Sequence, residues 1–506
     1  MEKSFTIKWK LKPQVKKLAS IFKITSTPYN FAIFGFLKYS EKYPHYLVSN
    51  LNPSNIMSKN SFETRRTFLS RCATIAAVTS LPEWFVQEKL TAAMESTNTL
   101  VTSPNSRPGI ALIGCGGMGN VDAGLALKWG DIVAVCDVDQ RRVDKAVIKY
   151  TKDGKAPTGY SDFRKIMERK DVDVIVNGTP DHWHTLINIA AAKAKKDIYT
   201  EKPLTLTIDE GKRLIKVVRD HKVVLQTGTQ QRSIQRFHLA CELVRNGRIG
   251  KLKEVKVYVP AGISGGPFES SPVPPELDWD FWQGQTPQVD YVKQRCHGSY
   301  RWWWEYAAGP VTDWGAHHND IARWGIGLTG PVEIEAKALK APVPGGYNTP
   351  SEFEATLVWP NGIIQTVNST TDDNPGGSII NPEGQRNGIK FIGTDGWIWV
   401  NRSEIKASNM ELLRSPLPAN AFRLEVSLNH MKNFFDCLVS RKDPISCVEE
   451  GHRSASIGHL IVIALRSGGK FQWDPENEIF VGEGAAKGNA QIAREMRKPY
   501  DYSFVG

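Results

Sequence analysis

The stretch GIALIGCGGMGNVDAGLALKWGDIVAVCDVD, residues 109–139, decides the fold of this chain. A short apolar run leads through Gly114-x-Gly116-x-x-Gly119 into a helical pattern, and a second apolar run ends at Asp137. Strand, glycine loop, helix, strand and acid in this order are typical of a βαβ unit that binds a dinucleotide. A glycine turn between strand and helix, with no ligand, is the structural alternative.

Each glycine of the loop has its own physical task. Gly114 permits a tight turn, Gly116 lets the backbone approach a pyrophosphate, and Gly119 lets helix and strand pack closely. The free N–H groups at the start of the helix attract the phosphates. The loop residues that we expect to contact the dinucleotide are Gly114, Gly116, Gly117, Met118 and Gly119.

The acid after the second strand bears on the choice of dinucleotide. The Asp137 carboxylate can bond ribose hydroxyls and disfavours a 2′-phosphate, so it favours NAD. Arg141 and Arg142 follow closely, and basic side chains there can accept a 2′-phosphate. The sequence therefore predicts NAD and leaves NADP open.

Strand and helix patterns alternate beyond residue 139. Strands are expected at 171–180, 197–203 and 223–228, with helices near 184–195 and 208–221. This rhythm predicts a parallel sheet covered on both faces, in which ligands bind beyond the carboxyl ends of the strands. The residues that we expect to line this crevice for the cofactor are Thr179, Pro180, His184, Glu201, Lys202 and Gln230.

A second polar segment, DWGAHHND at 313–320, gathers Asp313, His317, His318 and Asp320. On a helix over 310–325, Asp313 and His317 share one face, whereas His318 points about 100° away. A metal site, a structural His–Asp pair and a proton relay all fit this spacing. No further metal ligands follow at a recognisable spacing, so we expect no metal.

The segments GCGGMG, TPDHWH, EKPL (201–204) and DWGAHHND together resemble the Gfo/Idh/MocA family of nicotinamide-dependent sugar and cyclitol oxidoreductases. The resemblance starts near residue 108, and the Pro- and Trp-rich insertion 265–287 resembles a bacterial subgroup with many exported members. It implies that Lys202 reaches nicotinamide ribose and substrate, and that Asp313 and His317 form the family's catalytic pair. It also implies a homo-oligomer, either a dimer or a tetramer.

The fold that the resemblance implies is α/β: a Rossmann domain at 108–229 and an α+β domain at 230–506 with an open, mostly antiparallel sheet. The later sequence fits this, because KLKEVKVYVP, PVEIEAKAL, FEATLVWPNGIIQTVNST and GIKFIGTDGWIWVN alternate or are β-branched. Asn-Gly and Asp-Gly mark turns between them. Helices near 428–444 and 451–467 are expected to pack back on the first domain.

The relay interpretation has a concrete chemistry. His317 would remove the proton of a secondary hydroxyl while hydride leaves the carbon, since a His with a pKa near ~6.5 suits that base. Asp313 would orient the imidazole, and Lys202 would stabilise the alkoxide. Three consecutive tryptophans cannot all face one site, so some belong to the core. The residues that we expect to contact the sugar are Arg232, Arg301, Trp303, Tyr306 and His318.

The segment ETRRTFLSRCATIAAVTSLP, residues 63–82, resembles a twin-arginine export signal, which is recognised by a receptor and serves proteins exported already folded. Met57 precedes it, so we interpret 1–56 as an extension or a mis-assigned start and 57–107 as signal and linker. The prediction is folding in the cytoplasm and export to the periplasm. An amphipathic helix with chance arginines is the alternative.

Charge and cysteine content exclude some functions. Of the formal charge of +11, residues 1–56 hold +7 and the chain after residue 100 only +3, so no nucleic-acid partner is expected. The seven cysteines form no CxxC motif, which favours folding in a reducing compartment. The sequence has no uninterrupted apolar run of ~18 or more residues, so we expect no membrane-spanning helix.

An exported enzyme cannot recycle free NADH, so we expect a cofactor that is retained. The predicted function is oxidation of a secondary hydroxyl of a sugar, cyclitol or glycoside. The alternative is a glycoside hydrolase or lyase that works by transient oxidation, elimination, hydration and re-reduction, as in some relatives. That branch lacks the lysine that Lys202 supplies here. A non-catalytic NAD-binding regulator is less favoured, because Lys202 and His317 are both present.

Overall fold

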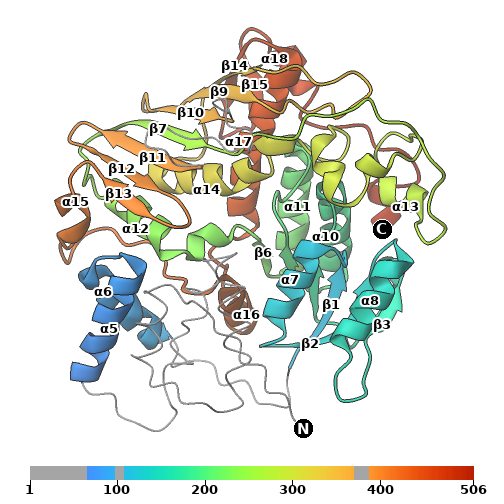
Figure 1. The fold of residues 1–506 in the computed structure, drawn as a ribbon, viewed down its shortest axis with the longest axis horizontal. Coiled ribbons are helices and arrows are strands. Elements are labelled where there is room, and N and C mark those ends of the chain that lie inside the picture. The colour runs from blue at the N-terminus through green and yellow to red at the C-terminus, as the bar shows by residue number, and fades with distance from the viewer. Residues whose placement is uncertain (1–64, 97–106, 370–386) are drawn as a thin grey trace, which may run out of the picture. The chain divides into compact units, whose positions relative to one another are not determined.

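The computed structural model describes residues 65–96, 107–369 and 387–506 (Figure 1). The predicted extension 1–56 and most of the linker before residue 107 lie outside these ranges. Within them, every helix is too short or too polar to cross a bilayer. All seven cysteines are described and are free thiols.

The first domain is built on a six-stranded parallel sheet with the strand order β3-β2-β1-β4-β5-β6. This is the order of a doubly wound dinucleotide-binding fold, in which the chain changes direction between β1 and β4. The α/β prediction is therefore confirmed. The strands are β1 (Gly109–Ile113), β2 (Asp131–Cys136), β3 (Thr158–Tyr160), β4 (Val174–Asn177), β5 (Asp197–Thr200) and β6 (Leu225–Thr227).

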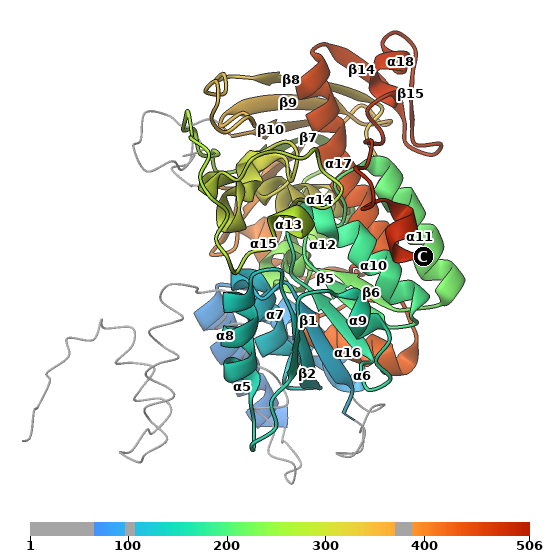
Figure 2. The same ribbon diagram turned by 90° about the vertical axis from the view of Figure 1, so that its right-hand side faces the viewer.

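Helices cover both faces of this sheet (Figures 1 and 2). Successive residues of a strand point to opposite faces, so Ile110 enters one apolar core and Ala111 the other. Strand β1 is consequently buried along its whole length. The helices are α7 (Gly117–Ala126), α8 (Gln140–Tyr150), α9 (Arg164–Met167), α10 (His184–Lys193) and α11 (Ile208–His221).

The second domain is built on a nine-stranded sheet with the order β13-β12-β11-β7-β10-β9-β8-β14-β15. Strands β7 and β10 pair in parallel, and the other pairs are antiparallel. The mostly antiparallel sheet is thus confirmed. Its strands are β7 (Leu252–Tyr258), β8 (Glu333–Ala338), β9 (Phe353–Val358), β10 (Ile364–Asn368), β11 (Gly388–Gly393), β12 (Trp397–Val400), β13 (Ile405–Ala407), β14 (Lys470–Asp474) and β15 (Ile479–Val481).

The helices of the second domain connect the sheet to the Rossmann domain. Helix α17 contacts β8 as well as α11 and β6, and α16 packs on α7, where Phe435 stacks on Trp129 at 5.5 Å. Both late helices thus lie against the first domain. The helices are α12 (Gln235–Arg245), α13 (Trp279–Gln283), α14 (Trp314–Ile326), α15 (Glu411–Arg414), α16 (His430–Ser440), α17 (Val448–Ser467) and α18 (Ala485–Asn489).

Two N-terminal helices, α5 (Arg65–Thr79) and α6 (Glu83–Ser96), lie in the region that we interpret as signal and linker. Phe85 of α6 is fully buried in the main core of the second domain. Lys89 forms an ion pair of 2.9 Å with Glu242 of α12, and both side chains are buried. Helix α6 is therefore part of the folded body.

Candidate active site

The glycine loop after β1 forms one wall of a cavity at the carboxyl edge of the parallel sheet. Gly114 has φ of +87°, and a Cβ there would lie 2.6 Å from backbone atoms of Gly178. A Cβ on Gly119 would lie 2.1 Å from the carbonyl oxygen of Gly114. These close approaches require glycine. Gly114, Gly116, Gly117 and Met118 line the cavity, whereas Gly119 is buried behind them where helix meets strand.

Asp137 lines the same cavity at the end of β2. Its carboxylate accepts hydrogen bonds from the backbone N–H of Cys115 (2.9 Å) and of Asp139 (3.0 Å). Burial raises the pKa of Asp137, and the charge of Arg142 opposes that effect. Arg142 also lines the cavity, whereas the Arg141 guanidinium is held by Asp139 at 2.9 Å. Arg142 is thus placed to contact a ligand in the cavity, whereas Arg141 forms an ion pair with Asp139.

The ends of β4 and β5 supply the opposite wall, where Thr179, Pro180, Glu201 and Lys202 line the cavity. His184 does not line it, although it was predicted to contact the cofactor. Its ring nitrogens lie 2.7 Å from the carbonyl oxygen of Pro203 and 2.9 Å from that of Thr179. His184 therefore ties together the two segments that carry the cavity residues. Gln230 lies in a 3₁₀ turn (Gln230–Ser233) and is not among the residues that line the cavity.

A lysine and an aspartate from the two domains meet beside this cavity. The Lys202 Nζ donates to the Asp313 carboxylate at 2.6 Å and to its backbone carbonyl at 2.9 Å. The Arg301 Nε lies 3.4 Å from the same carboxylate. Burial raises the pKa of Asp313, but the charges of Lys202 and Arg301 outweigh burial and lower it. Asp313 is therefore a carboxylate that holds the lysine in place.

His317 lies one turn further along, since α14 begins at Trp314 and Asp313 is its N-cap. The side chain is buried, and within the described residues its Nδ1 has no hydrogen-bond partner. Burial, together with the positive charges of Lys202 and Arg402, lowers the pKa of His317 well below its usual value. The expectation that Asp313 orients this imidazole is not supported, because the Asp313 carboxylate bonds Lys202 instead. His317 is therefore a neutral imidazole, and neither it nor Asp313 is among the residues that line the cavity.

The residues predicted to contact a sugar separate into two groups. Arg301 lines the cavity, whereas Trp303 is buried with its Nε1 bonded to the Gln294 carbonyl oxygen. Tyr306 is fully buried and packs edge-on against Trp282 at 4.8 Å. These two aromatic side chains therefore belong to the core of the insertion, and the prediction that they contact the sugar has no support in this geometry.

His318 and Arg232 lie away from the cavity. The His318 ring lies between Gln231 (3.2 Å) and Asn387 (3.1 Å) and is fully buried. The Arg232 guanidinium donates to Asp320 at 2.7–3.0 Å and to Glu450 at 2.8 Å.

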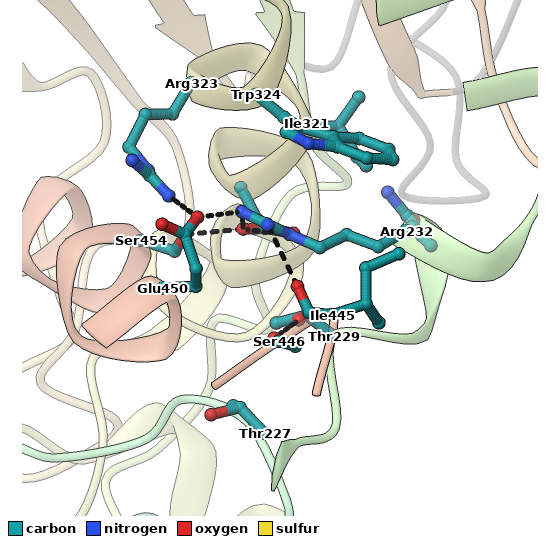
Figure 3. Close-up of polar contacts among 12 residues, drawn as sticks. Thr227, Thr229, Arg232, Ile321, Arg323, Trp324, Ile445, Ser446, Glu450 and Ser454 are labelled. Carbon is teal, nitrogen blue, oxygen red and sulfur yellow. Dashed lines mark hydrogen bonds and ion pairs between the residues drawn. The ribbon is translucent and has the colours of Figure 1, made fainter. Parts of the chain in front are cut away.

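Figure 3 shows the cluster around Arg232, in which Glu450 of α17 also accepts from Arg323. In the same cluster Ser454 donates to Asp320 at 2.5 Å. The cluster joins α14, which carries His317, to α17 and to the segment before α12. The predicted substrate role of Arg232 has no support in this geometry. Arg232 instead fixes the helix on which the base sits.

The insertion between β7 and α14 supplies cavity residues that sequence reasoning missed. Phe281, Trp282, His297, Gly298 and Tyr300 line the cavity, and we call residues 276–301 the strap. The Trp282 carbonyl oxygen accepts from the Trp183 indole at 3.0 Å, and Phe281 stacks on Tyr500 at 5.7 Å. The strap is thus joined to the Rossmann domain at Trp183 and to the C-terminal segment at Tyr500. The aromatic run DWDFWQ (278–283) was the feature of the sequence that could have indicated these cavity residues. Its contacts are with residues remote in sequence, such as Trp183 and Tyr500.

The cavity satisfies a specific test for a dinucleotide. Its floor is a glycine loop whose shape a single Cβ would block, followed by the N-terminus of α7. Asp137, Arg142 and Lys202 also line it. Among the described residues, no group of three or more His, Cys, Asp or Glu side chains is placed to hold a metal ion. The fold and site define a nicotinamide-dependent oxidoreductase architecture.

Comparison with known families agrees with this class. Residues 109–229 match the model of the oxidoreductase family NAD-binding Rossmann fold, and residues 263–502 match the model of its C-terminal alpha/beta domain. The chain belongs to the Gfo/Idh/MocA oxidoreductase family. Its first domain is an NAD-binding Rossmann domain.

Several curated proteins are similar over parts of the chain. Myo-inositol 2-dehydrogenase of Thermotoga maritima is 29% identical over 172 residues, which are 34% of this chain and 47% of that protein. Levoglucosan dehydrogenase of Pseudarthrobacter phenanthrenivorans is 27% identical over 257 residues, 48% of this chain and 58% of that protein. Glycosyl hydrolase family 109 protein 2 of Shewanella sp. (strain ANA-3) is 33% identical over 158 residues, 29% and 35% of the two chains. Thus the chain matches between 35% and 58% of the length of these relatives.

Solved structures share the fold. WlbA dehydrogenase of Bordetella pertussis, in complex with NADH and UDP-GlcNAcA, superposes with a TM-score of 0.55 at 19% identity, covering 73% of this chain and 99% of that one. Aldose-aldose oxidoreductase of Caulobacter crescentus, complexed with glycerol, gives 0.55 at 18% identity, with 72% and 100% covered. At such identities the likeness concerns the fold alone.

Proposed function

We propose that the protein is an NAD-dependent oxidoreductase that acts on a secondary hydroxyl of a sugar, cyclitol or glycoside and keeps its cofactor between turnovers. The observation that carries the proposal is the 2.6 Å contact between Lys202 and Asp313 beside the glycine-loop cavity. The names of the inositol and levoglucosan dehydrogenases among the relatives support the substrate class.

In this proposal His317 and Lys202 act on the same substrate oxygen in different ways. Neutral His317 accepts the hydroxyl proton, because burial keeps the imidazole unprotonated around neutral pH. Lys202, held by Asp313, donates to the same oxygen and stabilises the negative charge that develops on it. Bound NAD supplies the acceptor for the hydride that leaves the carbon. Gly114, Gly116, Asp137 and Arg142 would hold the cofactor.

The strap supports the retention of the cofactor. Tyr300 of the strap bonds Asp181 at 2.6 Å and lines the cavity opposite the glycine loop. Residues Gln140 and Asp278 add backbone hydrogen bonds between strap and Rossmann domain. These contacts hold the strap residues in the cavity lining, where they would slow the release of a bound dinucleotide.

The test measures turnover of candidate sugars and cyclitols by Lys202→Met and His317→Ala variants. Loss of a positioned proton-transfer group typically costs about 10²–10⁴-fold in rate. The exposed Lys216, paired with Asp220 one helical turn away, gives the control variant Lys216→Met, which keeps full rate. Full turnover by either site variant would refute the assignment. Mass spectrometry of the purified protein checks whether a nucleotide is retained.

A second candidate function is a glycoside hydrolase or lyase that oxidises a sugar hydroxyl transiently and reduces it again. The similarity to the Shewanella glycosyl hydrolase family 109 protein favours it, as does the strap over the cofactor cavity. To separate the candidates, the protein is incubated with glycosides and with free sugars, without added NAD. Cleaved glycoside without net NADH identifies the hydrolase, whereas oxidised free sugar identifies the oxidoreductase.

We further propose export by the twin-arginine pathway, supported by the sequence of residues 63–82. Cys72, Leu81 and Phe85 are buried in the same core, so cleavage beyond any of them would remove part of the folded body. We therefore place any processing before Cys72. Cell fractionation of the full chain and of an Arg65→Lys/Arg66→Lys variant tests this, and export of both to the same extent would refute it.

A further inference from the structure

A second cavity, of about 440 Å³, shares no lining residue with the cofactor cavity. It lies among the end of α14, the residues before α17 and the first turns of α17, next to the cluster of Figure 3. Small-molecule sites in proteins have volumes of roughly 300–1,000 Å³. We call it the arginine cavity, because four arginines line it: Arg232, Arg245, Arg323 and Arg453.

Arg323 lies in the wall of this cavity with most of its hydrogen-bonding capacity unused. The residue is 6% exposed, and among the described residues its guanidinium makes one hydrogen bond, from Nη2 to Glu450. The Nε of Arg323 is buried and has no partner there. A guanidinium carries five N–H donors, and a buried donor without an acceptor destabilises the fold. An acceptor bound in the cavity would satisfy these donors.

Two more arginines of the cavity have no carboxylate partner in the described part of the chain. Arg245 donates to the Trp324 carbonyl oxygen at 3.4 Å and thereby offsets the negative end of α14. Gly327 leaves room for this, since a Cβ there would lie 2.7 Å from the guanidinium carbon of Arg245. Arg453 is exposed on α17 and makes no hydrogen bond or ion pair with a described residue. Both guanidinium groups are therefore available to a ligand.

The carboxylates that line the cavity do not balance these charges. Glu450 accepts from Arg232 and Arg323 at once. Asp443 is paired at 2.6 Å with an arginine outside the cavity. Of the carboxylates in the described lining, Glu425 is thus the one left to oppose the two unpaired arginines. A negatively charged ligand is therefore favoured over a positively charged one.

A helix terminus and apolar side chains complete the site. Cys447 is the N-cap of the 20-residue helix α17 and lines the cavity, so the positive end of the helix dipole lies at its edge. Trp324, Leu328 and Ile445 supply an apolar wall. The cavity thus offers guanidinium donors beside a surface on which carbon atoms can pack.

We propose that the arginine cavity binds a small organic oxyanion, which is a carboxylate or a phosphate monoester on a short carbon skeleton. The anionic oxygens accept from Arg323 in the wall and from the exposed Arg245 and Arg453. Hydrogen bonds between such charged groups are roughly twice as strong as neutral ones. The carbon skeleton packs on Trp324. This site is separate from the proposed NAD cavity, and the inference does not rest on it.

Hydrogen exchange followed by mass spectrometry locates the anion on the full chain. The probes are gluconate, glucose 6-phosphate and inorganic phosphate, and uncharged glucose is the matched control ligand. Gluconate or glucose 6-phosphate is expected to slow exchange in residues 323–329 and 443–453, whereas glucose leaves these segments unchanged. A stronger effect of gluconate identifies a carboxylate ligand, and a stronger effect of glucose 6-phosphate identifies a phosphate ester. Slowing by inorganic phosphate alone would mean an adventitious ion only and would overturn the proposal.

Substitution of the exposed arginines tests the same site without disturbing the core, and titration calorimetry measures the affinity. Arg245→Gln and Arg453→Gln are each expected to weaken binding about two- to fivefold, as for an exposed ion pair, and the double variant about tenfold. Arg323→Gln is expected to weaken binding at least about tenfold, because it removes donors from the buried wall. Where Arg323→Gln does not fold, the double variant carries the test. The matched control is Arg213→Gln, an exposed arginine of α11 outside the cavity, which keeps full affinity.

Three results contradict the inference. The first is an unchanged affinity in the Arg245→Gln/Arg453→Gln double variant. The second is slowed exchange confined to the glycine loop at 114–119, and the third is no slowing with any of the three anions. None of these results bears on the proposed NAD-dependent function, which is tested by the Lys202 and His317 variants.

Discussion

Replacement of Arg232 by methionine distinguishes a structural residue from a substrate contact. The guanidinium is 3% exposed at its side chain, and its partner Asp320 is 1% exposed. Three hydrogen bonds to Asp320, at 2.7–3.0 Å, and one to Glu450 are lost with it. The methionine fills the space of the side-chain stem but leaves the Asp320 carboxylate without a counter-charge in the core.

The loss in the free energy of unfolding depends on which contacts Asp320 and Glu450 retain when Arg232 is replaced. Removing one member of a buried ion pair typically costs about 3–5 kcal/mol in the free energy of unfolding. Asp320 retains the Ser454 hydroxyl, and Glu450 retains Arg323. We therefore expect the lower end, about 3 kcal/mol, which is roughly a hundredfold shift in the unfolding equilibrium.

The assay is urea denaturation followed by circular dichroism, with steady-state kinetics under native conditions. The control is Arg213→Met, which breaks an exposed pair with Asp209 one helical turn away and costs at most about 1 kcal/mol. The double variant Arg232→Met/Asp320→Leu recovers part of the loss, because it removes the stranded carboxylate as well. A stability cost below about 1 kcal/mol for Arg232→Met, with a raised KM, would refute the structural role and restore the substrate role.

Two further predictions concern other parts of the fold. Phe85→Ala in α6 is expected to cost about 3–5 kcal/mol in urea denaturation, since the ring is fully buried; a loss below about 1 kcal/mol would mean that α6 is not part of the folded body. Burial raises the pKa of Glu450, but Arg323 and Arg232 outweigh it and lower the pKa to about 2. Its stabilising contribution is therefore present above the unfolded value near 4.5 and lost as pH falls toward 2. Glu450→Gln should flatten the pH dependence of stability in that window, and an unchanged acid-denaturation profile would contradict this.

The Rossmann domain was predictable because its signals are local. The glycine spacing, Asp137 after the second strand and the alternation of apolar runs each lie within a few dozen residues. The family resemblance added Lys202 and Asp313, which are 111 residues apart and meet at 2.6 Å.

Side-chain partners were harder to predict, because they come from remote segments. Spacing on a helix suggested that Asp313 pairs with His317, yet Lys202 from the other domain takes the carboxylate. Arg232 looked like a sugar ligand, but Asp320 and Glu450 enclose it. Buried polar groups form hydrogen bonds with partners that are close in space but often remote in sequence, so spacing along the chain does not predict these partners.

The contact between Lys202 and Asp313 also makes the reaction sensitive to how the two domains fit together. The lysine comes from the first domain and its carboxylate from the second, and Arg301 of the strap approaches the same group. A small rotation of one domain against the other would part these charges before it unfolded either core. A molecule that wedges the domains apart by an ångström or two would therefore leave the lysine unplaced and the chemistry slow. The fit between the two domains therefore sets the position of the lysine that the proposed chemistry uses.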